Sequence, residues 1–304
     1  MDKREFLVSS SSGLNERLDM FLSQKVQELT RSQLQRLIAE DKVKVNGTFR
    51  KASYKLKNGD RVELEFETPE ESEKIEPEDI PLNILYSDNH IVVLNKPAGL
   101  VVHPGAGHRR GTLASGLLFH YPEVKNIGHE ERPGIVQRLD KETSGVMVIA
   151  RSRNAYIELQ RQFIKREVKK VYLGLIWGKI PEKEGKITWP LGRHIKHGLR
   201  MSVKTRKPRE AETHYRVLKE FKDFTLLEIR PVTGRTHQIR VHLSAAGHPV
   251  VGDDVYGRRK GNRKFPRLFL HAYRLAFSHP ETGERVEFST PLPGDLQKVL
   301  DSFN

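Results

Sequence analysis

The first hydrophobic pattern along the chain has helical spacing. Within residues 14–66, two apolar stripes recur at intervals of three and four residues and predict two amphipathic helices. The stripes consist of Leu18, Phe21, Leu22 and Val26, and of Leu34, Leu37 and Ile38. Arg31 and Arg36 are left on the outer face of the second helix, and Asn46-Gly47 is typical of a hairpin turn. Residues 14–66 are thus expected to form a small αβ module with a basic surface.

Strand patterns dominate the remainder of the chain, residues 80–304. Short apolar or alternating runs predict strands at 91–94, 146–150, 170–177, 212–221, 224–230, 274–277 and 285–288. Helical spacing is found at 154–165, 236–246 and 296–303. Because the helices are fewer than the strands and do not alternate regularly with them, we expect an α+β domain with a mainly antiparallel mixed sheet.

An acidic segment separates these two parts. Residues 67–79 carry seven acids, with Lys74 as the only base, and almost no apolar side chains. Such a composition is typical of a linker. Since its charge would repel RNA, we expect it to tether the module without making RNA contacts of its own.

The overall charge points to a polyanionic partner. The chain has a formal net charge of +14 at pH 7, which favours binding to nucleic acid over a merely solvated basic surface. It contains no cysteine, so disulfides, thiolate metal sites and cysteine nucleophiles are excluded. No apolar run reaches membrane-spanning length and the first residues lack a signal-peptide pattern, so we expect a soluble cytoplasmic protein.

One carboxylate has a sequence context that suits a reactive group. Asp140 lies in a loop, directly before the apolar run 146–150, which predicts a buried strand. A loop that enters a buried strand would hold the acid firmly at the edge of the core. The same tripeptide recurs at Arg17-Leu18-Asp19, where the helical pattern instead suggests that Asp19 is a solvated acid at the start of a helix. A structural role for Asp140, as a turn residue that bonds local N–H groups, is the alternative.

Four segments in a fixed order resemble the RluA/RluD family of pseudouridine synthases. They are Asn95–Gly105, Gln137–Gly145 (QRLDKETSG), Lys170–Leu173 (KVYL) and Gly234–Leu243 (GRTHQIRVHL). The family pattern around the aspartate reads roughly H-R-L-D-x-x-T-S-G, so this chain departs from it at Gln137. The resemblance implies the pseudouridine synthase fold, and the module at residues 14–66 is similar to the S-four-like RNA-binding module that often precedes it.

The resemblance also implies roles for particular side chains. Asp140 would be the reacting carboxylate, Arg240 its ion-pair partner, and Tyr172 a ring that packs against the target uracil. The residues alone leave open whether Asp140 attacks C1′ or C6 or removes the C2′ proton. They also leave open whether Arg235 replaces Arg240 and whether Tyr172 is only a core aromatic. The isomerisation requires neither a cofactor nor a metal, and we expect none.

RNA contacts are expected from both parts of the chain. The candidates are Arg138, His103 and Arg235 near the reactive site, and Arg31 and Arg36 in the module. Two dense basic segments, 193–209 and 258–264, are further candidates. Large-subunit (23S) ribosomal RNA is the favoured substrate, transfer RNA is possible, and the protein is expected to act as a monomer.

Three alternative functions differ from this interpretation in class. A ribosome-assembly factor would bind RNA without chemistry, and a glycosidase-like enzyme would release free uracil. A nucleotide-dependent enzyme is disfavoured because residues 105–112 are rich in glycine but lack the Gly-Lys-Ser/Thr ending of a phosphate loop. The pairs His103/His108 and His237/His242 have no carboxylate in register, so they do not predict a metal site.

Overall fold

The computed structural model folds into two compact units, Met1–Lys74 and Ile75–Asn304. It describes residues 2–9, 13–26, 29, 31–66, 75–105, 110–195, 200–257 and 265–303. Most of the expected linker (67–74) and the basic segment 258–264 lie outside the described residues, as do the centres of the glycine-rich loop and of the segment 193–209. No helix in the described ranges is long and apolar enough to cross a membrane.

The first unit is a four-stranded antiparallel sheet with two helices. The strands are β1 (Asp2–Leu7), β4 (Arg61–Phe66), β2 (Val43–Val45) and β3 (Thr48–Phe49), in that spatial order, and the helices are α1 (Leu18–Lys25) and α2 (Arg31–Ala39). The predicted apolar stripes meet in one core, with Phe21 and Leu34 fully buried. Strand β1 was not predicted, because its sequence is mostly charged and its side chains are at most half-buried.

Asp19 contradicts the expectation of a solvated acid. Its side chain is completely buried and accepts hydrogen bonds from Arg17, Arg31 and Gln35. Burial raises the pKa of Asp19, but these hydrogen bonds outweigh that effect and hold the pKa well below its usual value. The prediction was wrong because the partners on α2 are 12 and 16 residues away and no local pattern reveals them. Arg31 is therefore engaged with Asp19, whereas Arg36 lies on the surface and pairs with Glu40.

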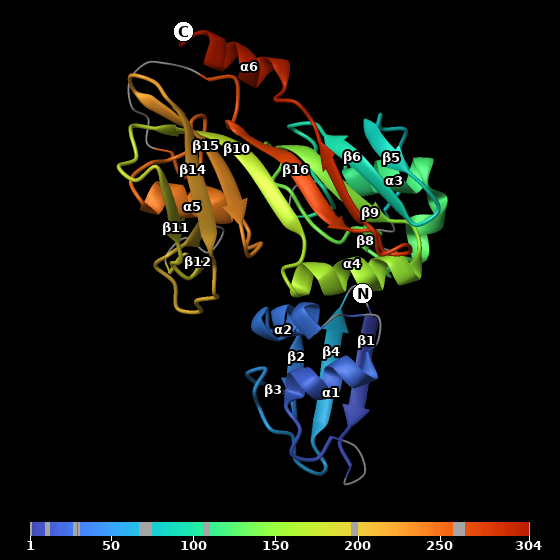
Figure 1. The fold of residues 1–304 in the computed structure, drawn as a ribbon. Helices are drawn as coiled ribbons and strands as arrows, with labels where there is room; N and C mark the ends of the chain where they lie inside the picture. Colours follow the sequence, from blue (N-terminus) through green and yellow to red (C-terminus); the bar gives the residue numbers. More distant parts are fainter. Residues whose placement is uncertain are drawn as a thin grey trace. The chain divides into compact units, whose positions relative to one another are not determined.

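The second unit contains a nine-stranded mixed sheet that is mainly antiparallel, as predicted (Figure 1). Its spatial order is β11-β14-β15-β10-β16-β9-β6-β5, and β17 also pairs with β16. Its strands are β5 (Ile84–Ser87), β6 (Ile91–Lys96), β9 (Ser144–Ala150), β10 (Lys169–Trp177), β11 (Glu184–Ile187), β14 (Thr213–Glu220), β15 (Phe224–Pro231), β16 (Leu270–Ser278) and β17 (Arg285–Ser289). Two small two-stranded antiparallel sheets pair β7 (Gly128–His129) with β8 (Arg132–Pro133) and β12 (Gly192–Arg193) with β13 (Met201–Ser202).

Among the described strands of this sheet, one pair is parallel. Strand β16 pairs with β9 over two residues, His271 with Ser144 and Ala272 with Gly145. This short contact joins an antiparallel half that begins at β11 to another that ends at β5. The loop that carries Asp140 enters β9 at this junction, so the candidate site lies at the centre of the sheet.

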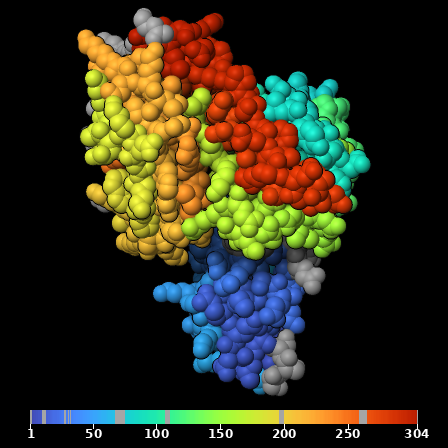
Figure 2. All heavy atoms as spheres, viewed as in Figure 1, coloured from blue at the N-terminus to red at the C-terminus, as the bar shows by residue number. Residues whose placement is uncertain are grey.

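Helices cover both halves of the sheet. Helix α4 (Arg153–Ile164) packs against β9, and α5 (Gln238–Ala245) packs against β14 and β15. Figure 2 shows α4 beside the C-terminal strands, where Gln162 and the backbone of Ser278 exchange two hydrogen bonds. The described residues also form α3 (Leu113–His120), the 3-10 helix η1 (Pro122–Asn126) and α6 (Gly294–Asp301).

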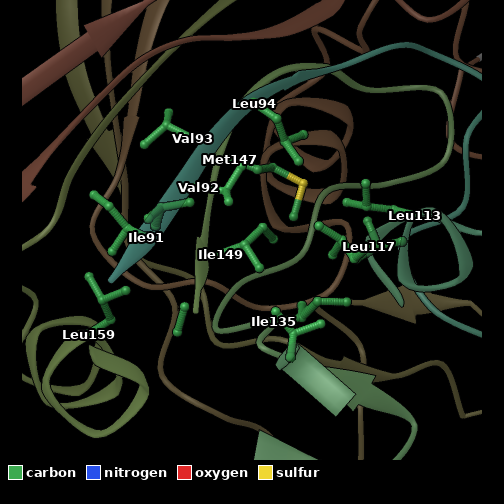
Figure 3. Close-up of a cluster of buried hydrophobic side chains, with 14 of the residues drawn as sticks. Ile91, Val92, Val93, Leu94, Leu113, Leu117, Ile135, Met147, Ile149 and Leu159 are labelled. Carbon is green, nitrogen blue, oxygen red and sulfur yellow. The ribbon is translucent and has the colours of Figure 1, made fainter. Parts of the chain in front are cut away.

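The largest apolar core lies around β6 and β9. Ile91, Val93, Leu94 and Met147 are almost fully buried there, and helix residues such as Leu117 pack against them (Figure 3). Helix α3 was not predicted, because it is too uniformly apolar to show an amphipathic pattern. The described end of the expected linker belongs to this unit, since Ile75 is buried in its core.

The buried network of Asp19 generates a test of stability. Replacing Asp19 with Asn should lower the free energy of unfolding of the first unit by about 2–3 kcal/mol at pH 7, because charge-assisted hydrogen bonds are lost. Since the folded-state pKa is depressed, this stabilisation is present above the unfolded value of about 3.9 and disappears as the pH falls towards the folded value. Hydrogen exchange of the α1 and β4 amides, measured from pH 7 downwards, checks both statements.

The matched control for this variant is Glu40→Gln. Glu40 pairs with Arg36 on the exposed surface, so its loss should change stability by less than about 0.5 kcal/mol. Equal effects of the two substitutions would contradict the importance of the buried network.

Candidate active site

The loop before β9 is held from two directions. Lys96, at the end of β6, is fully buried, and its ammonium donates to the carbonyl oxygens of Pro97, Leu100 and Lys141 at 2.7–3.0 Å. On the other side Arg267 donates to the carbonyl oxygen of Glu142 and to Ser144 Oγ. Burial lowers the pKa of Lys96 to about 7, while the charges of Glu142 and Asp140 oppose this shift. The backbone around Asp140 is thereby held by Lys96 at the end of β6 and by Arg267 in the segment that precedes β16.

The glycine of the Thr-Ser-Gly sequence, Gly145, is required by the backbone at the start of β9. Its φ of +124° lies in the region that favours glycine, and a Cβ built there would lie 2.2 Å from the carbonyl oxygen of Ala272. The parallel contact between β9 and β16 therefore requires glycine at this position. The adjacent Ser144 Oγ lies 2.9 Å from Nδ1 of the buried His271, which adds a side-chain contact to the same strand pair.

Arg240 connects Asp140 to a second, buried carboxylate. Its Nη1 donates to Asp140 Oδ2 at 3.0 Å, while Nε and Nη2 both donate to Asp253 at 2.8 Å. Asp253 also accepts the backbone N–H groups of Val255 and Tyr256, and the guanidinium carbon lies 5.1 Å from the centre of the Tyr256 ring. Burial lowers the pKa of Arg240, but the two carboxylates outweigh it and raise the pKa above its usual value. The guanidinium is thus charged and held in one orientation.

His237 and Tyr256 contact each other beside the ion pair of Asp140 and Arg240. His237 stands before α5 in a left-handed conformation, with φ of 55°. Its Nδ1 lies 2.8 Å from the Tyr256 hydroxyl, and its Nε2 lies 3.9 Å from Asp140 Oδ1. Burial lowers the pKa of His237 although the Asp140 charge acts in the opposite direction, so the imidazole is neutral at pH 7.

Tyr172 belongs both to the core and to the site. It lies on β10 opposite Ile229 of β15, and it packs against two apolar clusters. It also lines the same pocket as Asp140. Burial and the charge of Asp140 raise the pKa of Tyr172, so its phenol is protonated at neutral pH.

These residues surround one pocket in the second unit, with a volume of about 750 Å³. This size falls within the usual range for ligand sites. Of the candidates from the sequence, it brings together Asp140, Tyr172, Arg240, Arg138, His103 and Arg235. Arg31 and Arg36 belong to the first unit. Arg235 donates to the carbonyl oxygen of Glu210, so Arg240, and not Arg235, makes the ion pair with Asp140.

The charge of the lining is strongly unbalanced. Its described members include one carboxylate, Asp140, and the cationic side chains Arg132, Arg138, Arg166, Lys170, Arg235 and Arg240. Gln137, which departs from the family pattern, also lines the pocket, and its buried Nε2 has no hydrogen-bond partner. No cluster of His, Asp and Glu suitable for a metal ion occurs within the ranges that the structure describes.

Sequence reasoning missed several supporting residues. Asp253 lies 13 residues from Arg240, and its partner is set by how the chain folds back after α5, so spacing could not reveal it. The Gly252-Asp253 sequence was the available signal, since Gly252 has φ of +72° and a Cβ there would lie 2.0 Å from the carbonyl oxygen of Arg267. Lys96 was contained in a segment that resembles the family, but its burial could not be inferred from that segment.

Comparison with known proteins identifies the family and the two domains of the chain. The RNA pseudouridylate synthase family matches residues 90–245, and the S4 domain matches residues 16–62. The chain is 41% identical to the RNA pseudouridine synthase YlyB of Bacillus subtilis, over 98% of this chain and 97% of that protein. It is likewise 41% identical to the ribosomal large subunit pseudouridine synthase D of Nitrosomonas europaea, over 94% of this chain and 84% of that protein.

Solved structures give the same result. Human RNA pseudouridylate synthase domain containing 1 is 30% identical and superposes with a TM-score of 0.57, over 73% of this chain and 94% of that one. A second human protein, RNA pseudouridylate synthase domain containing 4, is 27% identical and superposes with a TM-score of 0.58, over 73% of this chain and 92% of that one. The chain belongs to the RNA pseudouridine synthase family and carries an N-terminal S4 domain. It is therefore an isomerase that acts on RNA.

Proposed function

We propose that this enzyme converts specific uridines of large-subunit ribosomal RNA to pseudouridine, with Asp140 as the reacting group. The observation that carries the assignment of Asp140 is its position as the one carboxylate among the described lining residues of the pocket, paired at 3.0 Å with Arg240. The choice of ribosomal RNA is supported by the similarity to large subunit pseudouridine synthase D of Nitrosomonas europaea.

The proposed reaction rearranges bonds within one nucleotide. The N1–C1′ bond breaks, the base turns, and a C5–C1′ bond forms, while C5 loses a proton and N1 gains one. Three routes remain open for Asp140, namely attack at C1′, attack at C6, and removal of the C2′ proton. Since no atom is gained or lost and no redox step occurs, the proposed reaction uses neither a cofactor nor a metal.

The surrounding residues suit this chemistry. Arg240 offsets the cost of partly burying the Asp140 charge, because an opposite charge and a direct hydrogen bond replace water. The Tyr172 ring provides an apolar face for the uracil, and its protonated phenol can donate or relay a proton. The target base must leave its stack to reach the pocket, which costs a few kcal/mol. The exposed Arg138 and the half-buried His103 are positioned to hold the neighbouring RNA.

The first unit is assigned to RNA docking. Arg36 is 79% exposed, and Arg17 and Arg31 keep nearly half of their side chains exposed while Asp19 fixes their orientation. Arginines held in this way lose little further freedom when they bind phosphates. We also propose that the enzyme acts in the cytoplasm, where ribosomal RNA is modified, and that it acts as a monomer.

The reaction is tested by tritium release from ribosomal RNA that is labelled at uridine C5. The wild-type protein should release tritium, and Asp140→Asn should abolish release while still binding the RNA, because the amide retains the shape of the carboxylate and loses its nucleophilicity. Glu142→Gln is the matched control: it makes the same charge change in the same loop at an exposed side chain and should keep wild-type release.

Other outcomes would identify the alternative classes. Free uracil in place of pseudouridine would indicate a glycosidase-like enzyme. Tight binding of ribosomal RNA by the wild-type protein without tritium release would indicate an assembly factor, and release by Asp140→Asn at the wild-type rate would refute the role of Asp140.

Removing residues 1–74 tests the docking role of the first unit. The second unit has its own apolar cores, so it should retain the chemistry. Loss of one of two linked binding surfaces should weaken RNA affinity by about tenfold or more and reduce its dependence on salt. Affinity titrations at several salt concentrations, together with mapping of the modified sites, measure this. Unchanged affinity and an unchanged site pattern would contradict the docking role.

A further inference from the structure

Lys170 is a cation in the pocket wall that the chemistry above does not use. It lies on β10 two residues before Tyr172, so the two side chains share a face and their Cα atoms are separated by roughly 6.6 Å. Its ammonium has one long hydrogen bond, at 3.4 Å, to the carbonyl oxygen of Thr233. Within the part of the chain that the structure describes, no carboxylate pairs with it.

This position is costly for a charged group. Burial lowers the pKa of Lys170 to about 8, and no neighbouring acid opposes that shift. The other buried cations near the site are better satisfied, since Lys96 has three carbonyl acceptors and Arg240 has two carboxylates. A half-buried ammonium with one weak acceptor is therefore suited to an anion that arrives with the ligand.

The pocket itself does not supply that anion. Asp140 is the one acid of the described lining, and its Oδ2 already accepts from Arg240. An RNA ligand brings phosphates on both sides of the target nucleotide, and rotation of that nucleotide out of its stack moves these phosphates towards the pocket. Lysine binds phosphate as a point charge and does not need the planar geometry of arginine.

We propose that Lys170 binds a phosphate group that flanks the target uridine. This assignment rests on the proposed function and adds to it the anchoring point of the flipped nucleotide. With Tyr172 against the base and Lys170 on the adjoining phosphate, one face of β10 holds both ends of the nucleotide while Asp140 acts from the opposite loop.

The contact between Lys170 and the phosphate is tested by combining Lys170 variants with RNAs in which a flanking phosphate is neutral. The RNA is the shortest large-subunit fragment that the wild-type protein binds and modifies, prepared with its normal backbone or with a neutral methylphosphonate on the 5′ or the 3′ side of the target. Lys170→Met should weaken binding of the normal RNA by roughly tenfold. On the RNA whose contacted phosphate is neutral, it should cause no further loss. Lys170→Arg, which keeps the charge, should restore part of the affinity.

Lys169→Met is the matched control. Lys169 is the preceding residue on the same strand and is exposed, so it carries the same charge outside the pocket. It should reduce the affinity for all three RNAs equally and by less than Lys170→Met.

Two results would overturn the assignment. In the first, Lys170→Met weakens the binding of all three RNAs by the same factor, which would mean a purely structural or general electrostatic role. In the second, Lys170→Met leaves the affinity for the normal RNA unchanged. Both differ from a failure of the proposed function, which would show as the absence of any RNA fragment that the wild-type protein modifies.

Discussion

The arrangement of the site depends on one shared guanidinium. Arg240 binds Asp253 through two hydrogen bonds and leaves its remaining nitrogen for Asp140. Asp253 is in turn fixed by two backbone N–H groups, so the orientation of Arg240 is set before any ligand arrives. This arrangement places one positive charge between two negative ones. The remaining cations around the pocket offset the excess negative charge and attract a polyanionic substrate.

The sheet brings the two sides of this ion pair together. Asp140 comes from the loop before β9, whereas Arg240 and Asp253 come from α5 and the turn that follows it, about 100 residues later in the chain. The short parallel contact between β9 and β16 joins these regions, and it depends on the close approach that only Gly145 permits. A change far from the chemistry, at the strand junction, would therefore move Asp140 relative to its partner.

Local signals account for what the sequence could predict. The buried strands, the apolar stripes of α1 and α4, and the loop around Asp140 all follow from patterns within a few residues. Pairings between distant residues could not be obtained this way. The local pattern around Asp19 predicted a solvated acid, because its partners lie on α2. Asp253 had no local feature that linked it to Arg240. Helix α3 was missed for a different reason, because its residues from Leu113 to Leu118 are all buried and leave no polar face that would show a helical period.

The most direct test of this account is the single-turnover rate of Asp253→Asn, measured beside its RNA affinity. Asparagine has nearly the same shape as aspartate, but its NH2 group is a donor and cannot accept a hydrogen bond from the guanidinium. Arg240 should therefore lose its fixed orientation. We predict unchanged affinity and a rate about 30-fold lower, equivalent to about 2 kcal/mol. Glu287→Gln, which breaks a more exposed pair with Arg274, should leave both unchanged. A folded Asp253→Asn protein with the wild-type rate would contradict the account.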